Sequence, residues 1–214
     1  MTADDVRTLR WIALGDSYTI GTSVRAPERW PDQLVARLAA RPVPGVAVSL
    51  VANLAVNGWT SADVVSRQLP VVERERPDLV SLLVGVNDVV QGVPTATYRA
   101  NVRKLLDALV TCATPDGVLT VETPDYTVTP AGADYGDPVE RRAAIDTVNA
   151  ILAEESAARG IAHVDGIAEL SRRVTTDPSL VAADGLHPSG SQYATWVDRI
   201  EPVVRDLVRR IAMT

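Results

Sequence analysis

The sequence predicts an α/β protein in which a parallel sheet is covered by helices on both faces. Two observations predict this class: five apolar runs bounded by turn-forming residues, and segments of helical periodicity that alternate with them along the chain. The 214 residues show no internal repeat, low-complexity tract or linker, and they are long enough for one domain with a substantial core. We therefore expect residues 1–214 to form a single domain.

The five apolar runs predict strands at residues 9–14, 46–56, 78–85, 117–122 and 161–165. Four segments between them predict helices at residues 31–41, 61–75, 97–111 and 138–160. Pro31 suits the first turn of a helix, and Gly160 suits the end of one. A last helix follows "HPSGS" at residues 187–191, and we expect it to bend or break at Pro202.

One long connection has neither helical nor strand periodicity. It covers residues 123–137, "TPDYTVTPAGADYGD". Loops of about this length in compact domains are often functional, so this segment is the best candidate for a lid.

Charge and composition argue against several classes of protein. The net charge of −6 and the absence of a basic stripe argue against nucleic acid as a partner. No apolar run approaches the roughly 18 residues of a membrane span. Residues 1–10 contain two acids and lack the pattern of a secretory signal, so we expect a cytoplasmic protein. Cys112 is the single cysteine, which excludes an internal disulfide and a cysteine-based metal site.

Polar residues follow the first three predicted strands. In an open α/β sheet, working residues lie beyond the C-terminal ends of the strands. The first strand is followed by "GDS" with Ser17, the second by "NGW" with Gly58, and the third by "GVND" with Asn87. Each of these is also typical of an ordinary turn or helix cap. The chain contains no GxG, so a nucleotide cofactor is not expected.

A fourth feature lies near the C-terminus. In "AADGLHPSG", Asp184 stands three residues before His187, and a tight turn at this spacing lets the carboxylate hold the near imidazole nitrogen. The far nitrogen then remains free to accept a proton from a serine. The other histidine, His163, lies inside the fifth predicted strand and fits a structural role.

With these residues the sequence resembles the GDSL family of hydrolases, also called SGNH hydrolases. The four blocks "GDSYTIG", "AVNGWTS", "GVND" and "DGLHPSG" stand in the order of the family and span nearly the whole chain. Two departures are mild: Val86 replaces a glycine found in many relatives, and the first block reads "GDSY" where the family has "GDSL". The resemblance implies a three-layer α/β/α sandwich with a flavodoxin-like five-stranded parallel sheet of strand order 2-1-3-4-5.

The same resemblance implies roles for the residues of the four blocks. Ser17 would be the nucleophile, His187 the general base and Asp184 its carboxylate partner. The N–H groups of Ser17 and Gly58 and the side-chain amide of Asn87 would form the oxyanion hole. We expect no metal and no cofactor in this chemistry.

The expected substrate is a small carboxylic ester with a short or medium acyl chain. Four residues adjoin the catalytic positions and could line an acyl pocket or equally anchor their turns in the core: Tyr18, Trp59, Val86 and Leu186. An acyltransferase or thioesterase would use the same triad and the same acyl-enzyme. A binding domain that retains the fold without catalysis is the alternative from another class.

Overall fold

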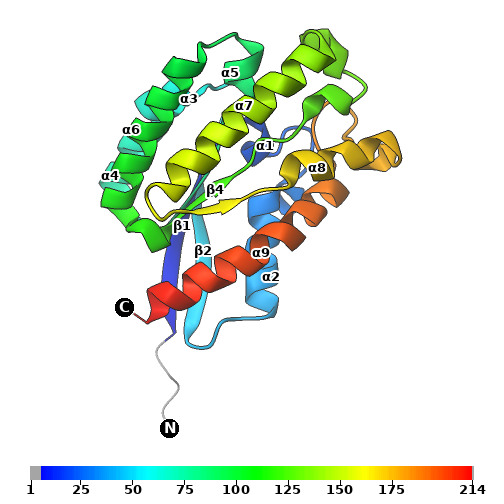
Figure 1. The fold of residues 1–214 in the computed structure, drawn as a ribbon. Helices are drawn as coiled ribbons and strands as arrows, with labels where there is room; N and C mark the ends of the chain where they lie inside the picture. The colour runs from blue at the N-terminus through cyan, green and yellow to red at the C-terminus, as the bar shows by residue number, and fades with distance from the viewer. Residues whose placement is uncertain (1–5, 214) are drawn as a thin grey trace.

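The computed structural model describes residues 6–213, and five parallel strands form the sheet at its centre (Figure 1). The strand order is β2-β1-β3-β4-β5, which confirms the predicted topology. All five predicted strands are present, with the bounds β1 Arg7–Gly15, β2 Val46–Asn53, β3 Leu79–Leu83, β4 Val118–Val121 and β5 Ala162–Val164.

The middle of the sheet is buried on both faces. Every residue of β3 and of β4 is buried, as expected for strands with helices above and below them. β1 pairs with β2 on one side and with β3 on the other, so that Trp11 lies opposite both Leu50 and Leu79. The C-terminal ends of β1, β2 and β3 therefore lie side by side at one edge of the sheet.

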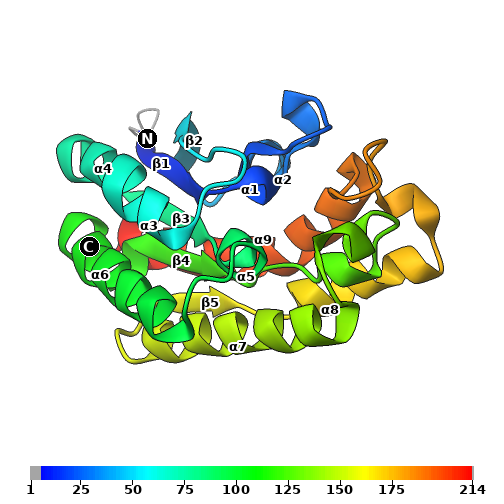
Figure 2. The same ribbon diagram turned by 90° about the horizontal axis from the view of Figure 1, so that it is seen from above.

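Helices cover both faces, as predicted. On one side α2 (Trp30–Ala40) packs against α9 (Gly190–Ala212), and on the other side lie α4 (Leu69–Glu75) and α6 (Thr95–Ala113) (Figure 2). The long helix α7 (Pro138–Ala157) packs against α6 and against β4 and β5. The largest fully buried side chains include Trp30 of α2 and Trp196 of α9.

Local sequence signals explain where the long helices begin. Pro31 occupies the first turn of α2, where its missing N–H is not needed. Asp137 caps α7 by accepting the N–H groups of Val139 and Glu140 at 2.9 Å and 3.0 Å. Ser189 caps α9 through its side-chain oxygen.

The helix expected at residues 61–75 forms as three joined pieces. They are α3 (Ser61–Asp63), a π turn (Val64–Gln68) and α4 (Leu69–Glu75). The N–H of Leu69 bonds to the carbonyl of Val64, five residues earlier. Pro70 follows at once and has no N–H to donate, so a widened turn fits the chain at this point.

The last helix is not broken at Pro202, so of the two expected effects of this proline the break does not occur. The helix α9 runs from Gly190 to Ala212 with Pro202 inside it. Pro202 is exposed, so the carbonyl that loses its helical partner one turn earlier can bond to water. The opposite side of the helix, which includes Trp196, Ile200 and Val204, is buried in the core.

Three short helices complete the fold: α1 Ser17–Ile20, α5 Val86–Val90 and α8 Ile167–Ser171. The first two follow β1 and β3 at the C-terminal edge of the sheet. The connection at residues 123–137 contains two short 3-10 turns, Tyr126–Val128 and Gly132–Tyr135. Its first part is buried, including Thr123, Asp125 and Tyr126.

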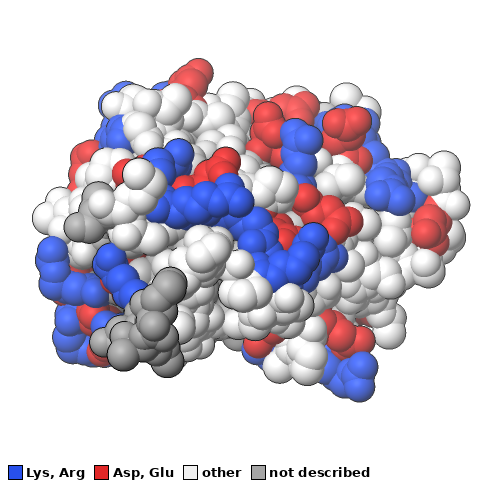
Figure 3. All heavy atoms as spheres, turned by 90° about the horizontal axis from the view of Figure 1, so that it is seen from below, with Lys and Arg blue, Asp and Glu red and all other residues white. Residues whose placement is uncertain are grey.

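The face seen from below in Figure 3 has basic side chains beside acidic ones. Ion pairs of this mixed kind also join α2 to α9, where Arg37 contacts Asp198 and Arg41 contacts Glu201 at 3.0 Å. None of the helices within residues 6–213 has both the length and the apolar character that a membrane crossing requires. Residues 1–5, on which the expected lack of a secretory signal partly depends, lie outside the described residues.

Candidate active site

Ser17 begins α1 directly after β1 ends. Gly15 has a φ of +145°, and a Cβ atom there would lie 2.2 Å from the Leu83 carbonyl oxygen, so this position requires glycine. Asp16 caps the helix, since its Oδ1 atom accepts the N–H of Tyr18 at 3.0 Å. The turn leaves Ser17 6% exposed, and its N–H at the start of the helix has no hydrogen-bond partner among the described residues.

A buried glutamine holds the same turn from behind. Gln68 donates from Nε2 to the Gly15 carbonyl at 2.7 Å and accepts the Gly15 N–H on Oε1 at 2.9 Å. Both polar groups of Gly15 are thereby satisfied away from water. Gln68 ends the π turn, so the irregular helix and the position of Ser17 are directly connected. Sequence reasoning missed this residue, because a contact between residues 53 positions apart leaves no local pattern.

Asp16 is itself completely buried. Burial and, to a smaller extent, the negative charge of nearby Asp88 raise its pKa to about 7. Its Oδ2 atom has no hydrogen-bond partner among the described residues. The carboxyl group behind Ser17 is therefore neutral in mild acid and gains a charge as the pH rises through neutrality.

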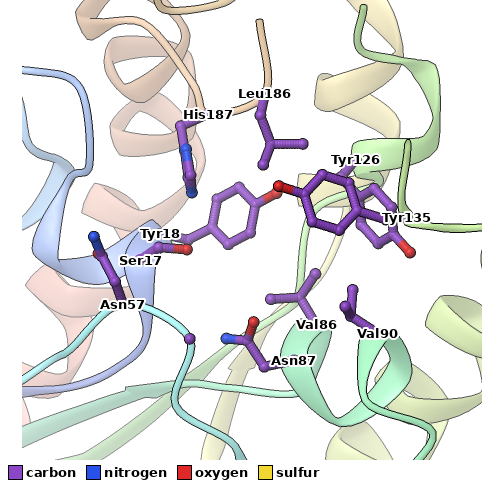
Figure 4. A pocket seen from close by; sticks show the side chains of 11 residues that line it. Ser17, Tyr18, Asn57, Val86, Asn87, Val90, Tyr126, Tyr135, Leu186 and His187 are labelled. Carbon is purple, nitrogen blue, oxygen red and sulfur yellow. The ribbon is translucent and has the colours of Figure 1, made fainter. Parts of the chain in front are cut away.

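Asn87 is carried by α5, which follows β3. Its neighbour Asp88 accepts both the N–H of Ser61 at 2.9 Å and the Ser61 hydroxyl at 2.5 Å, which ties α5 to the start of α3. The Asn87 amide donates one hydrogen bond to the Trp59 carbonyl at 3.0 Å. Its second N–H remains available, and Figure 4 shows the amide at the cavity that Ser17 also lines.

Gly58 lies on the exposed connection after β2. Its φ is +77°, and no atom lies within 4 Å of the position where a Cβ would stand, so backbone conformation alone favours glycine. Gln91 donates to its carbonyl at 2.9 Å and fixes the peptide, while the Gly58 N–H has no partner within residues 6–213. Ser17, Gly58 and Asn87 therefore lie at the same cavity.

The Asp184–His187 turn also forms as predicted. The Nδ1 atom of His187 lies 2.6 Å from Oδ2 of Asp184, and Oδ1 of Asp184 accepts the N–H groups of Leu186 and His187, each at 2.9 Å. Partial burial acts to raise the pKa of Asp184, but the hydrogen bonds from Ser23 and from the turn outweigh it. They hold the pKa of this carboxyl well below its usual range.

One cavity of about 220 Å³ is lined by Ser17, Gly58, Asn87 and His187 (Figure 4). The His187 ring points toward Ser17 from the opposite side, without a hydrogen bond between the two side chains. Such contacts are often long before substrate binds. The ring of Tyr18 lies beneath His187, with ring centroids 5.4 Å apart.

Of the four residues that could line an acyl pocket or anchor their turns, three line this cavity: Tyr18, Val86 and Leu186. Trp59 does not line it. The chain turns after Gly58, and the N–H of Trp59 bonds back to Val56 at 3.3 Å. Trp59 contributes its carbonyl to Asn87 instead of its ring to the cavity.

Sequence reasoning missed four residues of the wall: Asn57, Val90, Tyr126 and Tyr135. The two tyrosines come from the connection at residues 123–137, so the proposed lid segment contributes to the wall. The unusual length of this connection was the signal in the sequence that could have assigned its tyrosines to the wall of the cavity.

His163 takes no part in this cavity. It lies on β5, where its Nδ1 atom is 2.9 Å from the Thr120 hydroxyl, and burial lowers its pKa. Within residues 6–213 no group of three histidine, cysteine, aspartate or glutamate side chains is arranged to hold a metal ion.

Several known proteins are similar to this chain. An arylesterase of Vibrio mimicus is 24% identical over 201 residues, which cover 94% of this chain and 88% of the relative. The structure of a lipase/acylhydrolase from Enterococcus faecalis matches with a TM-score of 0.71 and 24% identity, covering 92% of this chain and 96% of the other. Axe2, an acetylxylan esterase from Geobacillus stearothermophilus, matches with a TM-score of 0.71 and 21% identity, covering 94% and 96%. These structural likenesses show the shared fold.

Residues 13–195 match the GDSL-like lipase/acylhydrolase family, a range that includes all four sequence blocks. The fold and this match define a carboxylic ester hydrolase built on an α/β sandwich. The chain belongs to the GDSL-like lipase/acylhydrolase family.

Proposed function

We propose that the chain is a serine esterase that hydrolyses small carboxylic esters of short to medium acyl chains through an acyl-enzyme. The observation that carries this proposal is the convergence of Ser17, Gly58, Asn87 and His187 on one cavity from four separate segments. Asp184 stands directly behind His187. These are the nucleophile, base, carboxylate and oxyanion donors that acyl transfer requires.

In the proposed mechanism the Nε2 atom of His187 accepts the Ser17 proton as the Ser17 oxygen attacks the ester carbonyl carbon. The carbonyl oxygen becomes an oxyanion, which receives hydrogen bonds from the N–H groups of Ser17 and Gly58 and from the Asn87 amide. Collapse of the tetrahedral intermediate expels the alcohol, which takes its proton from the His187 imidazolium.

Water completes the cycle in the same manner. His187 removes a proton from the water molecule as its oxygen attacks the acyl-enzyme. The second intermediate expels Ser17, which regains its proton, and the carboxylic acid leaves. Asp184 stabilises the imidazolium that forms in both halves of the reaction, because its charge lies beside Nδ1.

The cavity supports a small acyl group. A volume of about 220 Å³ falls below the roughly 300–1,000 Å³ of pockets that hold drug-sized ligands. Val86, Val90 and Leu186 give it an apolar wall, and the exposed Asn57 and Tyr135 belong to its rim. The relatives named for aryl esters and acetylated xylan are in keeping with small esters.

A panel of p-nitrophenyl esters of increasing chain length, assayed beside acetylated sugars, tests this proposal. We expect kcat/KM to be highest for a short acyl chain and to fall as the chain outgrows the cavity. No turnover of any ester would contradict the proposal. A second assay with added alcohols and thiols as acceptors separates hydrolysis from acyl transfer, since both share the acyl-enzyme.

A further inference from the structure

The loop that follows α1 reaches across to the Asp184–His187 turn. The hydroxyl of Ser23 donates a hydrogen bond to Oδ2 of Asp184 at 2.6 Å, although the two residues lie 161 positions apart. The same oxygen lies 2.6 Å from Nδ1 of His187. Ser23 and His187 therefore share one carboxylate oxygen.

The backbone of Ser23 makes this contact more informative. Its φ is +65°, and among the described residues only Arg76 and Thr114 share a positive φ without being glycine. This region favours glycine, and residues held there by their surroundings concentrate at functional sites. A glycine would relieve the strain at Ser23 but would lose the hydroxyl.

The four contacts of the Asp184 carboxylate use both of its oxygens. Oδ1 accepts two backbone N–H groups of its own turn, and Oδ2 lies against Ser23 and His187. Of these four partners, Ser23 alone comes from outside the turn. It thereby fixes the rotation of the carboxylate relative to the rest of the fold.

We propose that Ser23 is a positioning residue for the Asp184–His187 pair, which orients the carboxylate and withdraws charge from its Oδ2 atom. This inference depends on the proposed function, in which His187 acts as the base. Ser23 is not among the residues that line the cavity, so it acts through Asp184 and not on the substrate.

Loss of the Ser23 hydroxyl has two expected effects. The carboxylate loses the one contact that comes from outside its turn and is held less precisely, which lowers kcat by about three- to tenfold, the range for one hydrogen bond of ordinary net strength. KM stays unchanged, because no contact to the substrate is lost. Oδ2 also keeps more of its charge and stabilises the imidazolium more strongly, so His187 stays protonated to higher pH. The acid limb of the kcat profile therefore moves to higher pH.

The titratable groups around the pair lie on α1, on α9 and at the residue that caps α1. Tyr18 of α1 and Tyr193 of α9 face it, and burial raises the pKa of both phenols well above the usual value, so they stay neutral. Asp16 also titrates near neutrality, at a pKa of about 7. Since Ser23 does not contact Asp16, a difference between variant and wild type reports the Asp184–His187 pair.

The neighbouring residue supplies a matched control. The hydroxyl of Thr22 donates to the Asn57 side chain at 2.5 Å, on the other side of the same loop. Thr22→Val removes this hydroxyl without touching Asp184. We expect the acid limb of this variant to stay at the position found in the wild type.

The test compares the wild type, Ser23→Gly, Ser23→Ala and Thr22→Val. We would measure kcat and KM on p-nitrophenyl acetate from about pH 5 to about pH 9, the range in which histidine titrates, together with thermal unfolding. Ser23→Gly should keep or raise Tm while kcat falls and the acid limb moves to higher pH. Ser23→Ala should show the same kinetic change with a lower Tm, since alanine keeps the backbone strain.

Ser23→Gly with the kcat and acid limb of the wild type would overturn the inference. A loss of activity that only follows unfolding would overturn it too. Labelling with a fluorophosphonate probe distinguishes a failure of this inference from a failure of the proposed function. A wild type that is not labelled at Ser17 contradicts the proposed function, whereas a labelled wild type with an unaffected Ser23→Gly contradicts only the role of Ser23.

Discussion

The Nδ1 atom of His187 lies 2.6 Å from Oδ2 of Asp184, and one tight turn carries both residues. The Asp184 carboxylate therefore contacts both the backbone of the turn and the imidazole. Its Oδ1 atom accepts backbone N–H groups and shapes the turn, while its Oδ2 atom lies against the imidazole. A substitution that removes the charge of Asp184 but keeps an oxygen at the Oδ1 position separates the effect on the turn from the effect on the imidazole.

Asp184→Asn is such a change. The Asn oxygen can still accept the N–H groups of Leu186 and His187, so the turn should hold, but the imidazolium loses its charged partner. We expect kcat/KM to fall by less than about 10⁴-fold, the loss known for such carboxylates in other folds. Comparison with Ser17→Ala and His187→Ala on one ester checks this. An Asp184→Asn variant as inactive as Ser17→Ala would show that the backbone supplies none of the orientation.

The second prediction concerns Asn87. Its amide is held by the Trp59 carbonyl with one N–H left over. In the proposed mechanism that N–H bonds to the oxyanion only in the transition state. Asn87→Ala should therefore lower kcat by roughly 100- to 1,000-fold and change KM little. Steady-state kinetics on a short p-nitrophenyl ester measure both. A change confined to KM would argue that Asn87 binds the ground state instead.

Gln68 is expected to matter for stability and activity together. Gln68→Leu leaves the buried N–H of Gly15 without its partner, which costs roughly 1–3 kcal/mol of unfolding free energy. It also loosens the turn before Ser17, so kcat should fall. Urea unfolding and esterase assays on the same preparation test this.

The matched control is Gln192→Leu. Gln192 is equally buried, but its Nε2 atom has no hydrogen-bond partner in the described part of the chain. This variant should lose little stability. If Gln68→Leu and Gln192→Leu lose the same unfolding free energy, the hydrogen bonds to Gly15 do not explain the loss of stability.

Asp16 gives a pH-dependent prediction. Burial raises its pKa from the usual value to about 7, so the native state binds a proton that the unfolded state has already lost. Its contribution to stability is fully present below about pH 4 and is lost as the pH rises through 7. Asp16→Asn resembles the protonated acid and keeps the oxygen that accepts the Tyr18 N–H.

The unfolding free energy of Asp16→Asn should therefore rise relative to the wild type between about pH 4 and about pH 8, by roughly 4 kcal/mol in total. Urea unfolding at several pH values measures this difference. Asp206→Asn, at an exposed carboxylate of α9, is the control and should show no comparable trend. A constant difference between Asp16→Asn and wild type across this range would mean that Asp16 is already ionised in mild acid.

The strands and the residues at their ends were predictable because their signals are local. An apolar run bounded by turns identifies a strand, and a parallel sheet brings Ser17, Gly58 and Asn87 to one edge. The three-residue spacing of Asp184 and His187 is likewise a local signal. The strand order itself came from the family resemblance and not from the periodicity.

The residues that support the site could not be predicted in this way. Gln68 and Ser23 reach Gly15 and Asp184 across 53 and 161 residues, and such contacts depend on packing that no short pattern encodes. The sequence left open whether Pro202 bends or breaks α9, because the rule for proline does not consider which side of the helix faces water. It also left open whether Trp59 lines the pocket, because proximity in sequence does not determine the direction of a side chain.

The central claim is that Ser17 is the nucleophile. Its most direct test is to react wild type and Ser17→Ala with a fluorophosphonate ester and to locate the adduct by mass spectrometry of the peptides. We expect one adduct in the wild type, on the peptide that contains Ser17. The Ser17→Ala variant should stay folded, form no adduct and have no esterase activity. An adduct on another residue, or esterase activity that survives in Ser17→Ala, would contradict it.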